Sequence, residues 1–139
     1  MSRQPTEITF RLQLQQGHGG KLWFAIPLHV EHYAVLMLPN SAAARSVITP
    51  TTFEKLKSTN LAGLTTTQIR SRRQGVVLNA LRLMGHQLLD LEFQVRHVAE
   101  LRLPDGRYVV DGYLGLDFFM ANFTAMRYEF RTFRLTLEL

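Results

Sequence analysis

The residues of this 139-residue chain that could take part in chemistry are few and dispersed. Ser41 and Ser46 carry hydroxyl groups, but a serine becomes a nucleophile only beside a base, and the sequence offers no recognisable base for either. His29 and His32 have a spacing that suits a metal on a helix, yet they fall at a strand end or turn without an obvious third ligand. The absence of cysteine excludes disulfides and thiol chemistry. We therefore expect neither a metal nor another cofactor.

A second group of candidate functional residues is basic. Arg70, Arg72 and Arg73 lie in a polar segment, 64–75, in which we expect a hairpin tip. Such a tip could form a cationic lip that binds an acidic peptide or a nucleic-acid backbone, and the net charge of +5 would attract either partner. A simply solvated tip remains an alternative, since the arginines are scattered over most of the chain. The segment contains no aromatic residue, which weighs against nucleic acid.

Most of the chain is expected to form short strands. Apolar residues alternate with polar ones over several stretches, the pattern of a half-buried strand. The glycine-rich stretch 17–20 predicts a turn that joins the first two strands as a hairpin, and Pro27 suggests an edge position or a bulge. The predicted strands are 8–14, 22–30, 33–38, 76–84, 89–95, 108–110, 126–130 and 133–137.

One helix start is marked clearly in the sequence. Thr49 is a suitable N-cap and Pro50 a suitable first helical residue, so a short helix is predicted over 50–57. Short strands with turn signals such as Pro104-Asp105-Gly106 between them favour an all-β barrel or sandwich. With 46% hydrophobic residues, the chain can bury one core, and we expect a single domain over 1–139. Without a signal-like or membrane-spanning stretch, we expect a cytoplasmic protein with no membrane contact.

Two motifs in order along the chain resemble those of retropepsin-like aspartic peptidases. In that family an apolar strand leads into Asp-Thr/Ser-Gly-Ala, and a small-x-Ser/Thr-Val-Ile run then leads to a helix. Here the strand 33–38 leads into Asn40-Ser41-Ala42-Ala43, followed by Ser46-Val47-Ile48. The catalytic aspartate of the family therefore corresponds to Asn40.

The second motif is Gly112-Tyr113-Leu114-Gly115-Leu116-Asp117-Phe118-Phe119. It is similar to the Gly-Ile-Leu-Gly-Leu-Asp-Phe-Leu segment of bacterial retropepsin-like proteins. There, two apolar residues and a glycine pack beside the catalytic loop, which implies this position for Leu114 and Gly115, and a short helix follows. The resemblance is strongest over 22–139, whereas 1–21 supplies an N-terminal strand and turn.

The resemblance implies a small closed barrel with one or two short helices. It also implies a homodimer, since a single-domain member of the family supplies half of an active site. Asparagine cannot serve as a general base, so Asn40 predicts a catalytically inactive pseudopeptidase that binds or scaffolds peptide or protein ligands in the groove between subunits. Ser41 keeps the hydroxyl of the family, while Ala42 adds a Cβ where the family has glycine, and Pro39 removes a backbone donor.

Two alternatives to this interpretation stay open. The first is an active aspartic-type endopeptidase with atypical site chemistry, for which Asp111 and Asp117 are poor substitutes because a turn and a helix start explain them better. The second is a basic module that binds nucleic acid or an acidic partner through Arg70, Arg72 and Arg73, which fall where the family has its flap hairpin.

Overall fold

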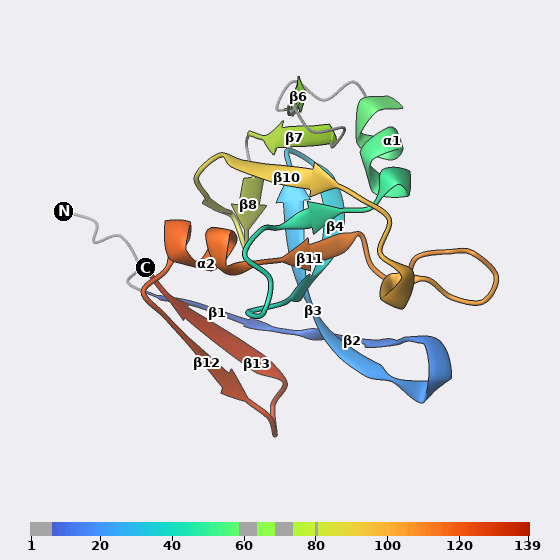
Figure 1. Ribbon diagram of the computed structural model, residues 1–139. Coiled ribbons are helices and arrows are strands. Elements are labelled where there is room, and N and C mark those ends of the chain that lie inside the picture. Colours follow the sequence, from blue (N-terminus) through green and yellow to red (C-terminus); the bar gives the residue numbers. More distant parts are fainter. Residues whose placement is uncertain (1–6, 59–63, 69–73, 80) are drawn as a thin grey trace.

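The structure, a computed structural model, describes residues 7–58, 64–68, 74–79 and 81–139 and consists mainly of β-strands (Figure 1). The strands are β1 (Glu7–Arg11), β2 (Gln13–Gln16), β3 (Leu22–Val30), β4 (Tyr33–Pro39), β5 (Val47–Ile48), β6 (Leu64–Gln68), β7 (Gln74–Leu78), β8 (Leu81–Leu83), β9 (His86–Gln87), β10 (Leu91–Val95), β11 (Gly112–Leu114), β12 (Ala125–Glu129) and β13 (Arg134–Glu138). Two α-helices, α1 (Pro50–Ser58) and α2 (Leu116–Asn122), and two 3-10 turns, His18–Gly20 and Ala99–Leu101, complete the described elements.

The larger sheet has the order β6-β7-β10-β5-β11-β4-β3-β8-β9, with β2 added beside β3. The sheet is curled (Figure 1). Fully buried side chains from several of its strands, including Ile26, Met37, Ile48 and Phe93, form the core. The predicted all-β class is thus confirmed. Among the described residues, neither α1 nor α2 is long and apolar enough to cross a membrane.

A smaller sheet, in the order β1-β13-β12, is built from the two ends of the described chain. Ile8 and Phe10 of β1 pair with Leu137 and Leu135 of β13, and all four side chains are buried in the same core as the larger sheet. Figure 1 shows the β12–β13 hairpin below the larger sheet, with β1 running along it. The two ends of the chain therefore close one side of the core.

The predicted strand 8–14 is in fact two strands that join different sheets. β1 pairs with β13, whereas β2 pairs with β3, so the expected N-terminal hairpin is limited to β2 and β3. The break falls at Leu12, whose side chain is buried and whose N–H donates to the Phe133 carbonyl oxygen at 2.7 Å. An alternating pattern identifies the buried face of a strand but not the neighbour against which it is buried.

The segment 108–110, predicted as a strand, is bent and makes only an isolated bridge between Tyr108 and Arg102. The Val109 N–H donates to the Leu101 carbonyl oxygen, whereas the N–H of Asp111, just after the segment, donates to the Leu36 carbonyl oxygen. The predicted strand 76–84 is likewise divided between β7 and β8. Both segments are predicted as continuous strands, and neither is one continuous strand in the structure.

The predicted start of the first helix is confirmed. α1 begins at Pro50, and the Thr49 hydroxyl accepts a hydrogen bond from the Thr52 N–H at 3.3 Å, as an N-cap does. Pro27, expected at an edge or a bulge, lies instead inside the sheet, opposite Leu36 of β4 in a register without a bulge. On the other side of β3 it falls between the part that pairs with β2 and the part that pairs with β8. Its missing N–H therefore removes no ladder bond from the described pairings.

β11 is the strand that fixes the middle of the larger sheet. It runs parallel to β4 and antiparallel to β5, so it fills the space between them. A Cβ at Gly112 would lie 1.9 Å from the Val47 carbonyl oxygen, a distance that no side chain can tolerate. Only glycine allows β11 and β5 to pair this closely.

We predict that Gly112→Ala lowers the free energy of unfolding by about 3 kcal/mol, because the added methyl group must push β5 and β11 apart. The measurement is urea denaturation followed by circular dichroism. Gly17→Ala is the matched control: its Cβ would lie 3.2 Å from the Trp23 ring, so the ring can move slightly and the loss should be smaller. Identical denaturation midpoints for Gly112→Ala and the unmodified chain would contradict the close approach.

Candidate functional site

Asn40 begins the loop that joins β4 to β5, and β11 holds the loop at its base. The Asn40 N–H donates to the Leu114 carbonyl oxygen at 2.8 Å, and the Ala43 N–H donates to the Asn40 carbonyl oxygen at 3.1 Å. Pro39, which has no N–H, is the last residue of β4, so the first donor after it is that of Asn40. The backbone of the loop thus starts from a defined position beside β11.

The Asn40 side chain is half-buried and has a defined orientation. Its Oδ1 accepts a hydrogen bond from the Ala42 N–H at 3.2 Å, so the side chain closes a turn over two residues of backbone. Because Oδ1 is used in this way, the Nδ2 group keeps its two donors for partners outside the turn. Among the described residues none accepts a hydrogen bond from this group. An aspartate could accept the same bond from Ala42, but only an amide also presents donors here.

The end of the loop is anchored to α2 by Asp117. The two oxygens of this carboxylate accept hydrogen bonds from the Ser46 hydroxyl at 2.7 Å and the Ser46 N–H at 3.0 Å. The Ser46 Oγ in turn accepts from the Gly115 N–H at 2.9 Å, and Ser46 is fully buried. Asp117 was expected to act at the helix start; it does so through the Phe118 N–H, and it also holds the loop.

Asp111 makes a second carboxylate bridge, although only a turn role was expected for it. Its Oδ2 accepts from the Leu36 N–H of β4 at 2.7 Å, and its Oδ1 accepts from the Thr52 hydroxyl of α1 at 2.6 Å. Its carbonyl oxygen accepts from the Thr49 N–H at 2.9 Å. Both oxygens are therefore engaged in joining β4 to α1, a structural rather than a catalytic arrangement.

Two neighbouring cavities meet beside Asn40. The first, which we call the Asn40 cavity, has a volume of about 350 Å³, and the second, the aromatic cavity, about 400 Å³. Both are lined by Trp23, Leu38 and Pro39, so they are neighbours, and we call the two together the groove. The Asn40 cavity is further lined by Lys21, Asn40, Val98, Glu100, Leu101 and Tyr113, and the aromatic cavity by Leu22, Phe24, Tyr128 and Phe130.

The polar groups of the Asn40 cavity are mostly hydrogen-bond donors. The lining residues Asn40, Lys21 and Tyr113 carry an amide, an ammonium group and a hydroxyl in their side chains. The Tyr113 oxygen already accepts a hydrogen bond from Arg96, which leaves its own proton available to a ligand. Glu100 is the acidic residue among those that line this cavity in the described part of the chain. This arrangement suits a ligand that presents carbonyl or carboxylate oxygens.

The aromatic cavity adds an apolar wall. The rings of Tyr128 and Phe130 stack with their centroids 6.5 Å apart. The ring centroids of Phe24 and Phe133 are 5.6 Å apart. Burial raises the pKa of the Tyr128 hydroxyl, so it is a neutral donor at physiological pH. Apolar side chains of a ligand would find a fitting surface here.

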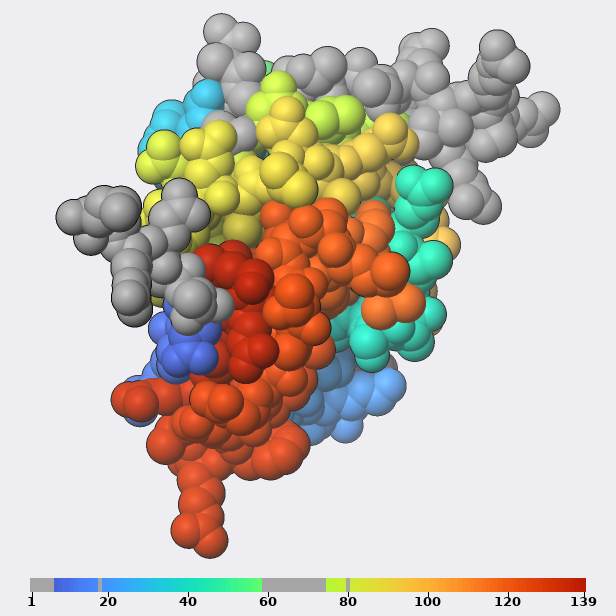
Figure 2. Space-filling model, turned by 90° about the vertical axis from the view of Figure 1, so that its left-hand side faces the viewer, coloured from blue at the N-terminus to red at the C-terminus, as the bar shows by residue number. Residues whose placement is uncertain are grey.

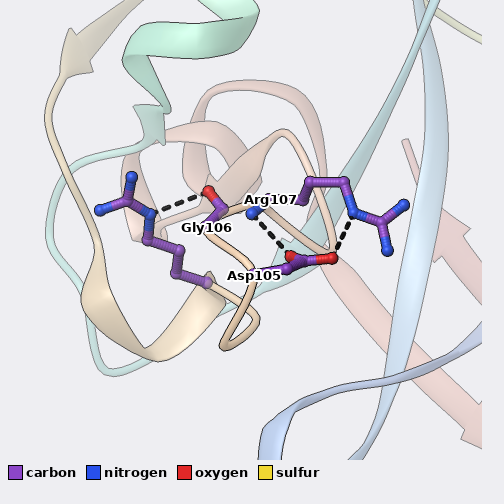
Figure 3. Close-up of polar contacts among 4 residues, drawn as sticks. Asp105, Gly106 and Arg107 are labelled. Atoms are coloured by element: carbon purple, nitrogen blue, oxygen red, sulfur yellow. Dashed lines mark hydrogen bonds and ion pairs between the residues drawn. The ribbon is translucent and has the colours of Figure 1, made fainter.

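The turn 104–107, predicted from its sequence, is held by its own charges (Figure 3). The Asp105 carboxylate accepts from the Arg107 N–H at 3.0 Å and from the Arg107 Nε at 2.7 Å, and these bonds lower the pKa of Asp105. The Arg102 Nε donates to the Gly106 carbonyl oxygen at 2.9 Å. The acid of this turn is therefore occupied by its own arginine.

The site residues predicted from the sequence have different positions in the structure. Ser41 and Ala42 are exposed at the top of the loop, next to Asn40. Leu114 and Gly115, expected to bind, are buried and line neither cavity. A Cβ at Gly115 would lie 2.7 Å from the carbonyl carbon of Arg45, so this residue supports the loop. The predicted basic residues Arg70, Arg72 and Arg73 lie outside the described residues.

Sequence reasoning missed most of the cavity wall. Lys21, Glu100 and Tyr113 come from separate segments that only the folded chain brings together. Trp23 of β3 lines both cavities. No local sequence pattern marks these residues, because they share only a place near the carboxyl end of β4 in the folded chain.

A solved structure is similar to the whole chain. It is that of a retropepsin-like aspartic protease from Rickettsia conorii, with a TM-score of 0.55 and 18% sequence identity over 99% of this chain and 96% of that chain. No family model matches the sequence, and no curated protein matches it. The similarity shows that the chain has a retropepsin-like fold.

We predict that Asp117→Asn lowers the free energy of unfolding by about 2 kcal/mol, because an amide nitrogen would face one of the two Ser46 donors. Ser46→Ala should also destabilise, and the double variant should lose clearly less than the sum of the two, since both changes remove the same contact. The measurement is a double-mutant cycle by denaturant unfolding. Asp90→Asn, at an exposed position, is the control and should have little effect. Additive losses would contradict a direct role for this pair.

Proposed function

We propose that this chain is a retropepsin-fold pseudopeptidase that binds peptide segments as a homodimer and does not cleave them. The observation that carries the proposal is Asn40. Asn40 lines the cavity, and its Oδ1 accepts the Ala42 N–H, which leaves its amide donors without a bond to the loop. Retropepsin-like proteins act as dimers in which each copy supplies half of the site, so both halves of this site would carry an amide.

The chemistry of an aspartic peptidase requires groups that exchange protons. Two carboxylates share one proton; one activates a water molecule as a base and the other protonates the substrate carbonyl. An amide can do neither at physiological pH, because it has no proton to lose or gain in that range. Loss of a central catalytic group lowers rates by on the order of 10⁴ to 10⁶.

The same groove is suited to holding a peptide. The donors of Asn40, Lys21 and Tyr113 can bind backbone carbonyl oxygens, while Trp23 and the aromatic cavity accept apolar side chains. Apolar contacts with a few fixed polar groups are the usual composition of a binding site of this size. We therefore assign to the groove a binding role that does not need a general base.

One observation favours a second candidate, an endopeptidase with atypical chemistry. Glu100 places a carboxylate in the wall of the Asn40 cavity and could act as a base on a bound water molecule. This candidate predicts cleavage that Glu100→Gln abolishes and that pepstatin does not inhibit.

We predict that the unmodified chain cleaves no member of a random peptide library, whereas the double variant Asn40→Asp, Ala42→Gly gains cleavage that pepstatin inhibits. The aspartate can accept the Ala42 N–H bond that Asn40 accepts, so the loop should keep its conformation. The measurement is mass spectrometry of the library after incubation at pH 4 to 7.

Asn40→Ala, Ala42→Gly is the matched control and should remain inactive. Cleavage by the unmodified chain that Asn40→Ala or Glu100→Gln abolishes would overturn the proposed lack of activity.

Binding can be tested without a label, because Trp23 is the single tryptophan of the chain and lines both cavities. We predict that peptides selected on the immobilised chain from a display library change its tryptophan fluorescence. Replacing Asn40 with alanine should weaken binding about tenfold through loss of its donors. Glu54→Gln, at an exposed position of α1, is the control and should bind as the unmodified chain does. Selected peptides that leave the fluorescence unchanged would place their site elsewhere.

A further inference from the structure

The residues that line the Asn40 cavity carry hydrogen-bond donors that have no acceptor among the described residues. The Oδ1 of Asn40 is used by the Ala42 N–H, so both N–H groups of the amide lack a partner. The Tyr113 oxygen accepts from Arg96, and no described acceptor takes the Tyr113 proton. Lys21 is exposed, and it forms no ion pair with a carboxylate in the described part of the chain. Each of these groups is available to a ligand.

Tyr113 is the most firmly held of these donors. It is only 8% exposed and belongs to the buried cluster that includes Val47, Val98 and Leu101. In β11 it pairs with Leu38 of β4, which lines the same cavity, and residues paired across neighbouring strands lie on the same face of a sheet. A buried donor without an acceptor raises the free energy of the folded chain, and an oxygen atom of a ligand would remove this cost.

Arg96 places a positive charge beside this donor. Its guanidinium group donates to the Tyr113 oxygen and lies over the Tyr113 ring, 6.0 Å from the ring centroid. A hydroxyl that accepts a bond from a cation becomes a stronger donor, because hydrogen bonds in a chain polarise one another. Within the described residues no carboxylate forms an ion pair with Arg96. Arg96 is not among the residues that line the cavity, so its effect on a ligand passes through Tyr113.

The charges at this cavity distinguish a carboxylate from a carbonyl group. An ionised carboxylate accepts bonds on two oxygens, and such charge-assisted bonds are about twice as strong as those to a neutral acceptor. Lys21 and Arg96 supply positive charge that the described carboxylates do not neutralise, and Asn40 is neutral where an aspartate would repel a carboxylate. Glu100 is the opposing charge, but it is exposed, so solvent screens it.

We propose that the Asn40 cavity binds a carboxylate of a peptide, either the C-terminal carboxylate or that of an Asp or Glu side chain. The inference rests on the proposed peptide-binding function and names the group that the site selects. Asn40, Lys21 and Tyr113 donate to the carboxylate, and Arg96 is a positioning residue for the Tyr113 hydroxyl.

The apolar part of the same peptide lies in the neighbouring aromatic cavity. Tyr128 of β12 and Phe130, which follows β12, contribute to the wall of that cavity. Figure 2 shows the orange and red C-terminal part of the chain over the lower half of one face, with blue β1 beside red β13. The ligand class is therefore a peptide that combines a carboxylate with apolar side chains.

The experiment compares two libraries of random octapeptides with acetylated N-termini, one with a free C-terminal carboxylate and one with a C-terminal amide. The full chain is incubated with each library at neutral pH, where carboxylates are ionised, and mass spectrometry identifies the retained peptides. We expect enrichment of the free-carboxylate library or, among amidated peptides, of those that contain Asp or Glu. The first result assigns the C-terminal carboxylate as the bound group, and the second assigns a side chain.

Variants then test the donors with the peptide that is enriched most, by isothermal titration calorimetry. Tyr113→Phe and Asn40→Asp should each raise the dissociation constant at least tenfold, the first through loss of the hydroxyl and the second through repulsion. Glu100→Gln should lower it about threefold, because it removes an opposing charge. Lys55→Gln, at an exposed position of α1, is the control for loss of a cation and should bind as the unmodified chain does. Circular dichroism should confirm that every variant is folded.

The role of Arg96 is tested by a double-mutant cycle with Tyr113. Arg96→Met keeps the aliphatic stem but cannot donate, and it should raise the dissociation constant about fivefold. In the Tyr113→Phe background the same change should have no further effect, since Arg96 acts through the hydroxyl. Equal losses in both backgrounds would contradict this positioning role.

Two results would overturn the inference and leave the proposed peptide binding intact. The first is equal enrichment of amidated peptides that contain neither Asp nor Glu. The second is a retained peptide whose affinity is unchanged by Tyr113→Phe and by Asn40→Asp, which would place its carboxylate outside the Asn40 cavity. Enrichment of no peptide from either library would contradict the proposed function and the inference together.

Discussion

The close packing of β11 against the segment that follows Asn40 is the constraint on which the rest of this structure depends. Gly112 meets the Val47 carbonyl and Gly115 meets the backbone of Arg45, and in each case a Cβ would overlap backbone atoms. Backbone cannot move aside as a flexible side chain can, so glycine is required at both positions. With β11 in place, the Leu114 carbonyl receives the Asn40 N–H, and the loop begins at a fixed point.

Two carboxylates complete this support, and neither is free to react. Asp117 binds the loop end at Ser46, and Asp111 joins β4 to α1. An unpaired donor in these partly buried places would cost more than an ordinary hydrogen bond contributes, so each carboxylate has a structural reason to be present. The chain thus keeps acids where the fold needs them, while the residue that faces the cavity from the loop is an amide.

The sequence predicts local structure better than it predicts neighbours. Thr49-Pro50 marks the start of α1 because capping is a matter of adjacent residues, and alternation over 22–30 identifies β3 for the same reason. The pattern over 8–14 could not show that the chain changes sheets at Leu12, since the alternation continues through Leu14, although Leu14 is exposed on β2.

The candidate site divides in the same way. Asn40 is recognisable because it lies within a motif of adjacent residues, whereas Lys21, Glu100 and Tyr113 become neighbours only after folding. For Leu114 and Gly115 the motif predicts a position next to the loop, but it cannot show that both residues are buried.

The central claim is that the groove holds peptides while the amide prevents their hydrolysis. The most direct measurement is incubation of the chain with selected peptides in water enriched in ¹⁸O, followed by mass spectrometry of bound and free peptide. Hydrolysis by an activated water molecule would add one labelled oxygen to each new carboxyl terminus. We expect the bound peptides to be recovered intact and unlabelled. Labelled fragments that appear with the unmodified chain and disappear with Asn40→Ala would contradict the account.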